Sequence, residues 1–219
     1  MTEKTTRLAV VHTVGTLLPL FKQKLAEAYP GADAFHMLDE SLLQDLIRHG
    51  QTPGLVARVT AHAQLAEKAG ATVILFTCSS TSPAIDTARK TVGIPIVKID
   101  DAMAREAAAR GNRIGLLCTT PSTVEPSSGL IRTHAQDLGR TVEIVTALEQ
   151  DAYHALMRGE RDEHDRIASN AARRMMETCD VIVLAQASLA HLAERLQQET
   201  PVPVLSSPDL CIKSLGQYL

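Results

Sequence analysis

Two stretches, RLAVVHT at residues 7–13 and RIGLLCT at residues 113–119, decide the fold because one is a near copy of the other. The repeat continues downstream, where ATVILFTCSS aligns with CDVIVLAQAS and places Cys78 over Gln186. IPIVKIDDA and VPVLSSPDL then align at that same spacing. Parallel strands resemble one another, which is the alternative explanation, but three matched pieces in one order favour duplication of a single unit.

Short apolar runs alternate with longer amphipathic stretches, a pattern typical of an α/β protein with mainly parallel sheets. The expected strands are residues 7–12, 32–37, 72–77, 94–99, 113–119, 141–146, 181–186 and 202–206. The clearest expected helices are residues 16–29, 41–50, 54–70, 102–111, 164–179 and 189–200. We therefore predict two pseudo-symmetric lobes, each a four-stranded sheet flanked by helices.

The expected N-terminal lobe takes residues 1–97 and 207–219, and the C-terminal lobe takes residues 98–206. In open sheets, ligands bind beyond the carboxyl ends of the strands. The expected active site is accordingly the cleft in which the two sets of strand ends meet.

Composition excludes several classes of function. The 219 residues are 45% hydrophobic and 21% charged, as in ordinary globular proteins, with a net charge of −3. That charge, with three Phe, three Tyr and no Trp, disfavours nucleic acid as a partner. No apolar run is long enough for a signal peptide or a membrane span, so we expect a cytoplasmic protein that does not bind membranes.

The four cysteines predict no disulfide framework and no metal site. They are widely spaced, no CxxC is present, and the histidines lack ligand spacing. The stretches HDRIASN and AYHALM, which contain His164 and His154, are expected to be solvated helix faces. We expect no metal and no cofactor.

Hydroxyl-bearing side chains gather at the predicted strand ends, where acids are scarce. The residues expected there are His12, Thr13, Cys78, Ser79, Ser80, Thr81, Lys98, Cys118, Thr119, Thr120, Gln186, Ser188, Ser206 and Ser207. Hydroxyls and backbone N–H groups at a strand-to-helix turn form a cradle for anions. The predicted partner is a small anionic carboxylate.

Cys78 is the candidate for chemistry. It follows the apolar strand TVILF, and Pro83 suits the first turn of the next helix. A thiol near a helix N-terminus forms its thiolate more readily and can act as a base or nucleophile. The alternative is a buried, inert cysteine.

GATVILFTCSST and DVIVLAQASLAHLAERLQQETPVPVLSSPDLCIKSL resemble the two cysteine motifs of the aspartate/glutamate/hydantoin racemase superfamily. That superfamily also includes maleate isomerase and arylmalonate decarboxylase. The resemblance implies a cofactor-independent enzyme in which two cysteines flank the substrate's α-carbon, and it gives Cys78 the first role. The second position departs from the pattern, because the family's Gly-Cys is Ala185-Gln186 here.

A glutamine cannot shuttle a proton near neutral pH, although its amide can hold a carboxylate or an oxyanion. The candidates for a second acid or base are His12 and its repeat counterpart Cys118, which we expect to be a packed core residue. Lys98 is expected to be solvated or ion-paired. Asp39 is explained by helix capping, although it could contact a substrate.

The predicted function is proton transfer at the carbon next to the carboxylate of a small acid. Cys78 is the predicted acid or base, and His12 is expected to assist it. The residues expected to bind the substrate are Thr13, Ser79, Ser80, Thr119, Thr120, Gln186 and Ser188. The runner-up is a single-cysteine decarboxylase, and a non-catalytic carboxylate-binding protein is the third reading. Cysteine could also add to an unsaturated diacid or a carbonyl. A homodimer or larger homo-oligomer is possible for such a fold.

Overall fold

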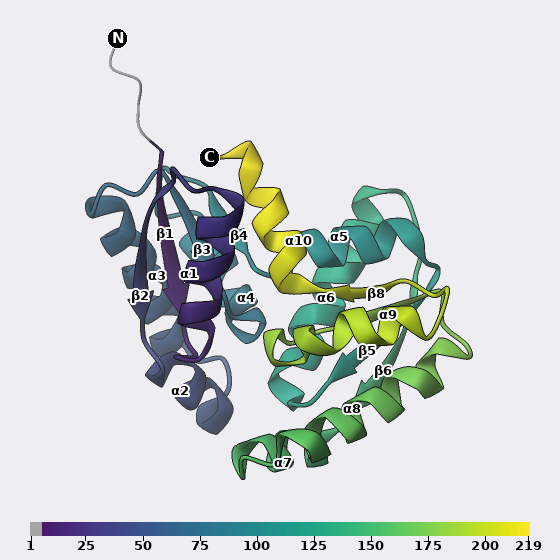
Figure 1. The fold of residues 1–219 in the computed structure, drawn as a ribbon. Helices are drawn as coiled ribbons and strands as arrows, with labels where there is room; N and C mark the ends of the chain where they lie inside the picture. The colour runs from purple at the N-terminus through teal and green to yellow at the C-terminus, as the bar shows by residue number, and fades with distance from the viewer. Residues whose placement is uncertain (1–5) are drawn as a thin grey trace. The chain divides into compact units, whose positions relative to one another are not determined.

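The computed structural model describes residues 6–219 and confirms the α/β fold with two four-stranded parallel sheets (Figure 1). The chain divides into two compact units. Unit 1 consists of the chain up to Ile99 together with the C-terminal segment Cys211–Leu219, and unit 2 is Asp100–Leu210.

In unit 1 the strands are ordered β2-β1-β3-β4. They are β1 (Arg7–His12), β2 (Asp33–Leu38), β3 (Val73–Phe76) and β4 (Ile96–Lys98). The helices are α1 (Leu17–Ala28), α2 (Ser41–His49), α3 (Pro53–Lys68), the 3-10 turn η1 (Ser79–Thr81) and α4 (Ser82–Ala88). Side chains of α2, α3 and α4 share one core with the sheet, and α1 brings Phe21 to His12 at the end of β1.

In unit 2 the strands are ordered β6-β5-β7-β8. They are β5 (Arg113–Cys118), β6 (Glu143–Leu148), β7 (Val181–Leu184) and β8 (Val204–Ser206). The helices are α5 (Asp101–Arg110), α6 (Pro121–Asp137), α7 (Gln150–Met157), α8 (Arg161–Met176), η2 (Ala187–Leu192) and α9 (Ala193–Gln198); α10 (Ser207–Ser214) and η3 (Leu215–Gln217) follow. Helices α5 and α6 pack in one core, whereas α8, η2 and α9 pack in another.

The duplication read from the sequence extends to the pairing register. Leu8 pairs with Val73 in unit 1, and Ile114 pairs with Val181 in unit 2. The ion pair between Arg7 and Asp33 at the start of the first sheet recurs between Arg113 and Glu143 in the second. The strands of the two sheets therefore end in equivalent positions and in the same spatial order.

Local sequence explains why several elements of unit 1 form and where they begin and end. The β3 residues Val73–Phe76 are all buried, as expected for a central parallel strand covered on both faces. Before α3, the Thr52 hydroxyl accepts the Leu55 N–H, and Pro53 occupies the first turn. Gly50 ends α2 at φ 70°, a conformation that glycine adopts without strain.

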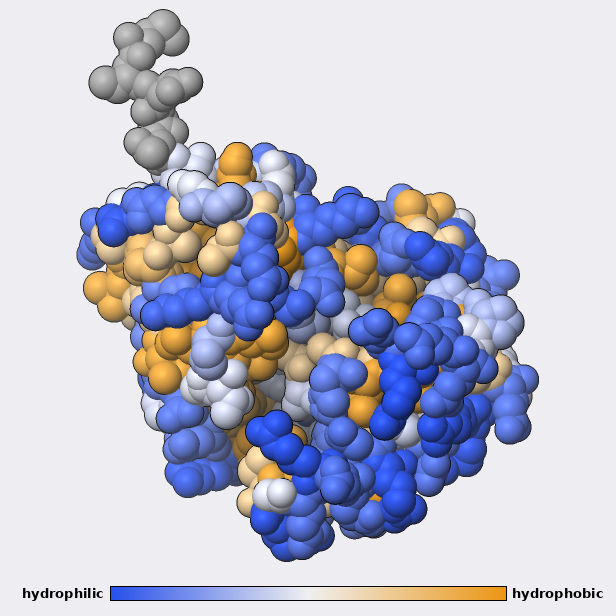
Figure 2. Space-filling view, viewed as in Figure 1, coloured by the Kyte–Doolittle hydropathy of each residue, from blue (hydrophilic) through white to orange (hydrophobic). Residues whose placement is uncertain are grey.

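The surface is mostly polar in the view of Figure 2, most clearly over α7 and α8. Among the described residues, no helix is both long and apolar enough to cross a membrane. All four cysteines are free thiols.

Candidate active site

Cys78 lies two residues beyond β3 and directly before η1, and its side chain is only 8% exposed. Its backbone is extended, with φ −130° and ψ 112°, so the chain turns sharply into η1 after it. The Thr81 hydroxyl and N–H both donate to the Cys78 carbonyl oxygen, at 2.9 and 3.3 Å. These bonds hold Cys78 at the strand-to-helix turn.

Burial raises the pKa of the Cys78 thiol above its ordinary value, because the thiolate loses hydration there. The nearby Thr13 hydroxyl and the backbone N–H groups of Thr81 and Ser80 oppose that rise. Thr13 Oγ1 is buried and has no hydrogen-bond partner among the described residues. The thiol is therefore protonated at neutral pH, beside donors that would stabilise the thiolate once it forms.

The hydroxyls expected around Cys78 come from η1 and from the end of β1. Ser79, Ser80 and Thr13 are 9%, 6% and 2% exposed, and all three belong to unit 1. The structure therefore brings these three predicted binding residues close to Cys78 along the chain or in space.

Gln186 occupies in unit 2 the position that Cys78 occupies in unit 1. It precedes η2 as Cys78 precedes η1, with a similarly extended backbone at φ −131° and ψ 140°. Its Oε1 accepts from the backbone N–H of Thr119 at 2.5 Å and from the Thr119 hydroxyl at 2.9 Å, while Nε2 donates to the Thr120 hydroxyl at 3.3 Å.

The Gln186 amide therefore ties the end of β7 to the residues that follow β5. Both of its polar atoms have protein partners, so its first effect is to orient Thr119 and Thr120. Ser188, the remaining predicted binding residue, is half-buried in η2.

His12 is fully buried at the end of β1 and belongs to a short polar chain that the sequence analysis missed. Its Nε2 lies 2.9 Å from Nδ1 of His36, and its Nδ1 lies 3.0 Å from Oγ1 of Thr77. Burial, assisted by His36 and Lys22, lowers the pKa of His12 to about 4. The only signal in the sequence for these linked side chains was His36, a histidine inside the mostly apolar strand β2.

His12 is expected to make the protein sensitive to mild acid. Its pKa is about 4 in the folded state against an ordinary 6.5, so the unfolded chain binds a proton first as the pH falls. The free energy of unfolding should therefore decrease between pH 6.5 and 4. His12→Gln should flatten this part of a urea-midpoint curve measured against pH, and the exposed His49→Gln should not. An unchanged slope in His12→Gln would assign the acid sensitivity to other groups.

Three other candidates have structural partners. Cys118 is fully buried in the core with α5 and α6, and burial raises its pKa to about 12, as expected of a packed thiol. Lys98 is ion-paired as expected, with Nζ 2.7 Å from Asp86 Oδ1. Asp39 contacts Arg58 and His62, and bonds from Ser41, His62 and Arg58 hold its pKa below the ordinary range despite burial.

The prediction that HDRIASN forms a solvated face is wrong for His164. This side chain is 1% exposed, and it lies with Asp165 and His191 in a cluster whose ligand atoms are all within 4.8 Å of one another. This cluster has no ligand spacing along the sequence, because His191 comes from η2, far along the chain from α8.

The sequence model of the family described as Asp/Glu/Hydantoin racemase matches residues 17–215, a range that includes both Cys78 and Gln186. The chain belongs to this family. The resemblance found in the sequence is thereby confirmed, and membership supports an enzyme of the racemase or isomerase class. No curated protein matches the chain.

Solved racemase structures share the fold. An aspartate racemase from Picrophilus torridus superposes with a TM-score of 0.73 at 13% identity, covering 97% of this chain and 93% of that one. A glutamate racemase from Francisella tularensis subsp. tularensis SCHU S4 in complex with D-glutamate gives 0.76 at 12% identity, covering 98% and 81%. An allantoin racemase from Klebsiella pneumoniae gives 0.63 at 16% identity, covering 97% and 86%.

Proposed function

We propose that this member of the racemase family transfers a proton at the carbon next to the carboxylate of a small acid, with Cys78 as the acid or base. The observation that carries the proposal is the position of the Cys78 thiol. It lies at a strand-to-helix turn among the hydroxyl of Thr13 and the N–H groups of Ser80 and Thr81. No comparable arrangement surrounds Cys118, which lies in the apolar core.

As a base, Cys78 has to lose its own proton before it removes one from the α-carbon, whereas as an acid it acts in the thiol form. A proton removed from the α-carbon leaves a carbanion or enediolate, and negative charge then resides on substrate oxygens. Hydroxyls and backbone N–H groups stabilise such charge best where water is excluded. Ser79, Ser80 and Thr13 are buried and can serve in this way.

Racemization needs proton exchange on both faces of the α-carbon, and Gln186 cannot supply the second proton. His12 is the proposed second group. Its ring is neutral at pH 7, because its pKa is about 4, so it would accept a proton from the α-carbon while the Cys78 thiol donates one. The ring also bonds to Thr77, the neighbour of Cys78 in the chain. Proton movement between Thr77, His12 and His36 along these bonds would give the ring a route for returning to its resting state.

Thr119, Thr120 and Ser188 are also proposed to bind the substrate, and Gln186 holds the two threonines in place. The proposed substrate class is a small carboxylate, because these groups are neutral donors and acceptors suited to an anion.

The test is proton NMR of the purified protein in D2O with amino acids, hydroxy acids and malonates, each run beside Cys78→Ala protein. Deuterium entering the α-position together with the opposite enantiomer, and neither with Cys78→Ala, is the expected result. Product with one carboxylate fewer would identify a decarboxylase instead. Exchange that survives Cys78→Ala would contradict the proposed role of the thiol, and binding without any exchange would point to a carboxylate-binding protein.

A further inference from the structure

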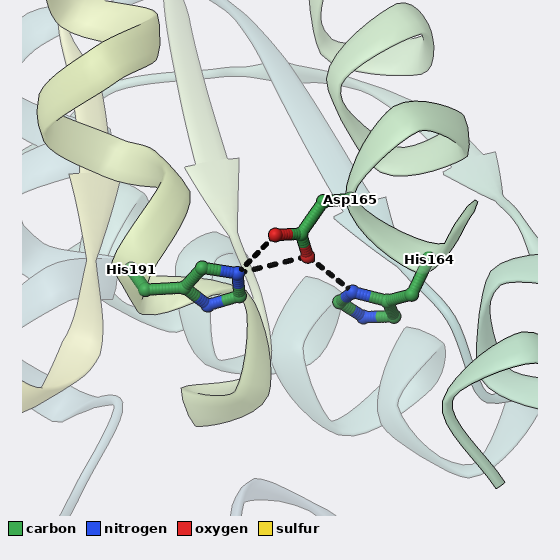
Figure 3. A group of neighbouring side chains, drawn as sticks. All are labelled: His164, Asp165 and His191. Carbon is green, nitrogen blue, oxygen red and sulfur yellow. Dashed lines mark hydrogen bonds and ion pairs between the residues drawn. The ribbon is translucent and has the colours of Figure 1, made fainter. Parts of the chain in front are cut away.

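A second polar cluster lies in unit 2, on elements that hold none of the proposed acid–base groups. His164 and Asp165 come from the first turns of α8, and His191 comes from η2 (Figure 3). His164 Nδ1 lies 2.7 Å from Asp165 Oδ1, and His191 Nε2 lies 2.8 Å from both Asp165 oxygens. The carboxylate is thus placed between two imidazole nitrogens that point toward it.

The burial of His164 distinguishes this cluster from a surface ion pair. The side chain is 1% exposed, and its Nε2 is a buried atom with no hydrogen-bond partner among the described residues. The other ring nitrogen, Nδ1, faces Asp165 and is the one that could bind an ion, and Nε2 would then carry the ring proton. The only hydrogen bond shown for this ring is to Asp165, so its polar contacts belong to the cluster.

We propose that His164, Asp165 and His191 bind a divalent transition-metal ion, with Zn²⁺ as the best fit. Two imidazole nitrogens and one carboxylate oxygen are a donor set that Zn²⁺ accepts, at metal–ligand distances of about 2.0–2.2 Å. The three donor atoms already lie within 4.8 Å of one another. At such bond lengths, the ligand atoms of a tetrahedral site are about 3.3 Å apart. The nitrogen and oxygen atoms that are now hydrogen-bonded would therefore have to move apart only slightly to bind the ion.

Binding replaces two hydrogen bonds by coordination. A neutral imidazole that ligates through one nitrogen carries its proton on the other, so each ring moves its proton away from Asp165 or releases it to solvent. The side chain of His191 is 55% exposed and that of Asp165 is 24% exposed, which leaves a path for the ion and a position for water as a fourth ligand. The ionised carboxylate supplies the negative charge.

The proposed ion site is independent of the proposed acid–base chemistry. The cluster requires neither Cys78 nor a substrate. Because η2 begins directly after Gln186 and contains His191, an ion at the cluster would join α8 to the segment that follows the Gln186 amide link.

The test is calorimetric titration of the metal-free full chain with Zn²⁺, using His191→Gln as the variant and His49→Gln as the matched control. His191 and His49 are both exposed, so neither replacement removes a core contact. The expected result is one equivalent bound by the wild type, at least tenfold weaker binding by His191→Gln, and no change in His49→Gln. No binding, or equal weakening in both variants, would overturn the proposal.

Co²⁺ provides a readout that separates this site from the thiols. Coordination by nitrogen and oxygen should give visible d–d bands without thiolate-to-cobalt charge-transfer bands, and Asp165→Asn should remove them. Charge-transfer bands, or d–d bands that persist in Asp165→Asn, would assign the ion to other residues and overturn the proposal.

Discussion

Cys78→Ser is expected to slow α-proton exchange by about 10²–10⁴-fold, the contribution usual for a positioned acid or base. The hydroxyl keeps the size and polar contacts of the thiol but does not ionise in the useful range. The measurement is the initial rate of deuterium incorporation, followed by NMR with the substrate that the panel identifies. Far-UV circular dichroism of both proteins would show that the fold is retained.

The matched control is Cys118→Ala, which removes a thiol from the corresponding place in the repeat. Cys118 is fully buried in the core, so its removal should affect stability rather than the exchange rate. An equal loss of exchange rate in Cys78→Ser and Cys118→Ala would mean that neither thiol acts directly.

The exchange rate of the wild type should also rise with pH above neutrality, because the pKa of Cys78 is raised and the thiolate is the form that removes a proton.

Phe76→Ala is expected to lower the free energy of unfolding by about 3–5 kcal/mol, the range usual for removing a buried aromatic side chain. Phe76 is fully buried at the end of β3, in the core beneath α2, α3 and α4. Its carbonyl oxygen also accepts the Ile99 N–H at 3.0 Å. Urea unfolding would measure the loss, and the Tm should fall by roughly 6–20 °C.

Phe35→Ala is the control for this prediction. Phe35 is only half-buried on β2, with the Arg7 guanidinium 4.9 Å from its ring centre. It therefore loses less contact on truncation, and its cost should be under half that of Phe76→Ala. Equal costs would show that burial in the β3 core does not decide the stability of unit 1.

Strand positions could be predicted from the sequence because apolar runs and their repeat are local signals. The expected strand at residues 7–12 coincides with β1, and each of the other expected strands overlaps an observed one. The alignment of Cys78 with Gln186 also predicted equivalent positions, and both residues precede a 3-10 turn in the structure.

Helix α6 could not be read in the same way, because it contains Pro126 followed by two serines and Gly129. Proline lacks the N–H that an interior helical position donates, so this composition argues against a helix. Tertiary packing overrides it: Thr123, Ile131 and Ala135 are buried along the helix. Packing of distant elements likewise creates the Gln186 amide link and the cluster of His164, Asp165 and His191, neither of which has a local signal.

The return of residues 211–219 to unit 1 affects the order in which the protein can mature on the ribosome. The Tyr29 hydroxyl donates to the Ile212 carbonyl oxygen at 2.9 Å, and Leu215 is fully buried. Translation therefore delivers every residue of unit 2 before the last segment of unit 1 has been made. Domains usually mature from the N-terminus onward during synthesis. Unit 1 therefore stays incomplete until residues 211–219 have been synthesised, and part of its apolar surface is uncovered until then, although unit 2 can already be complete.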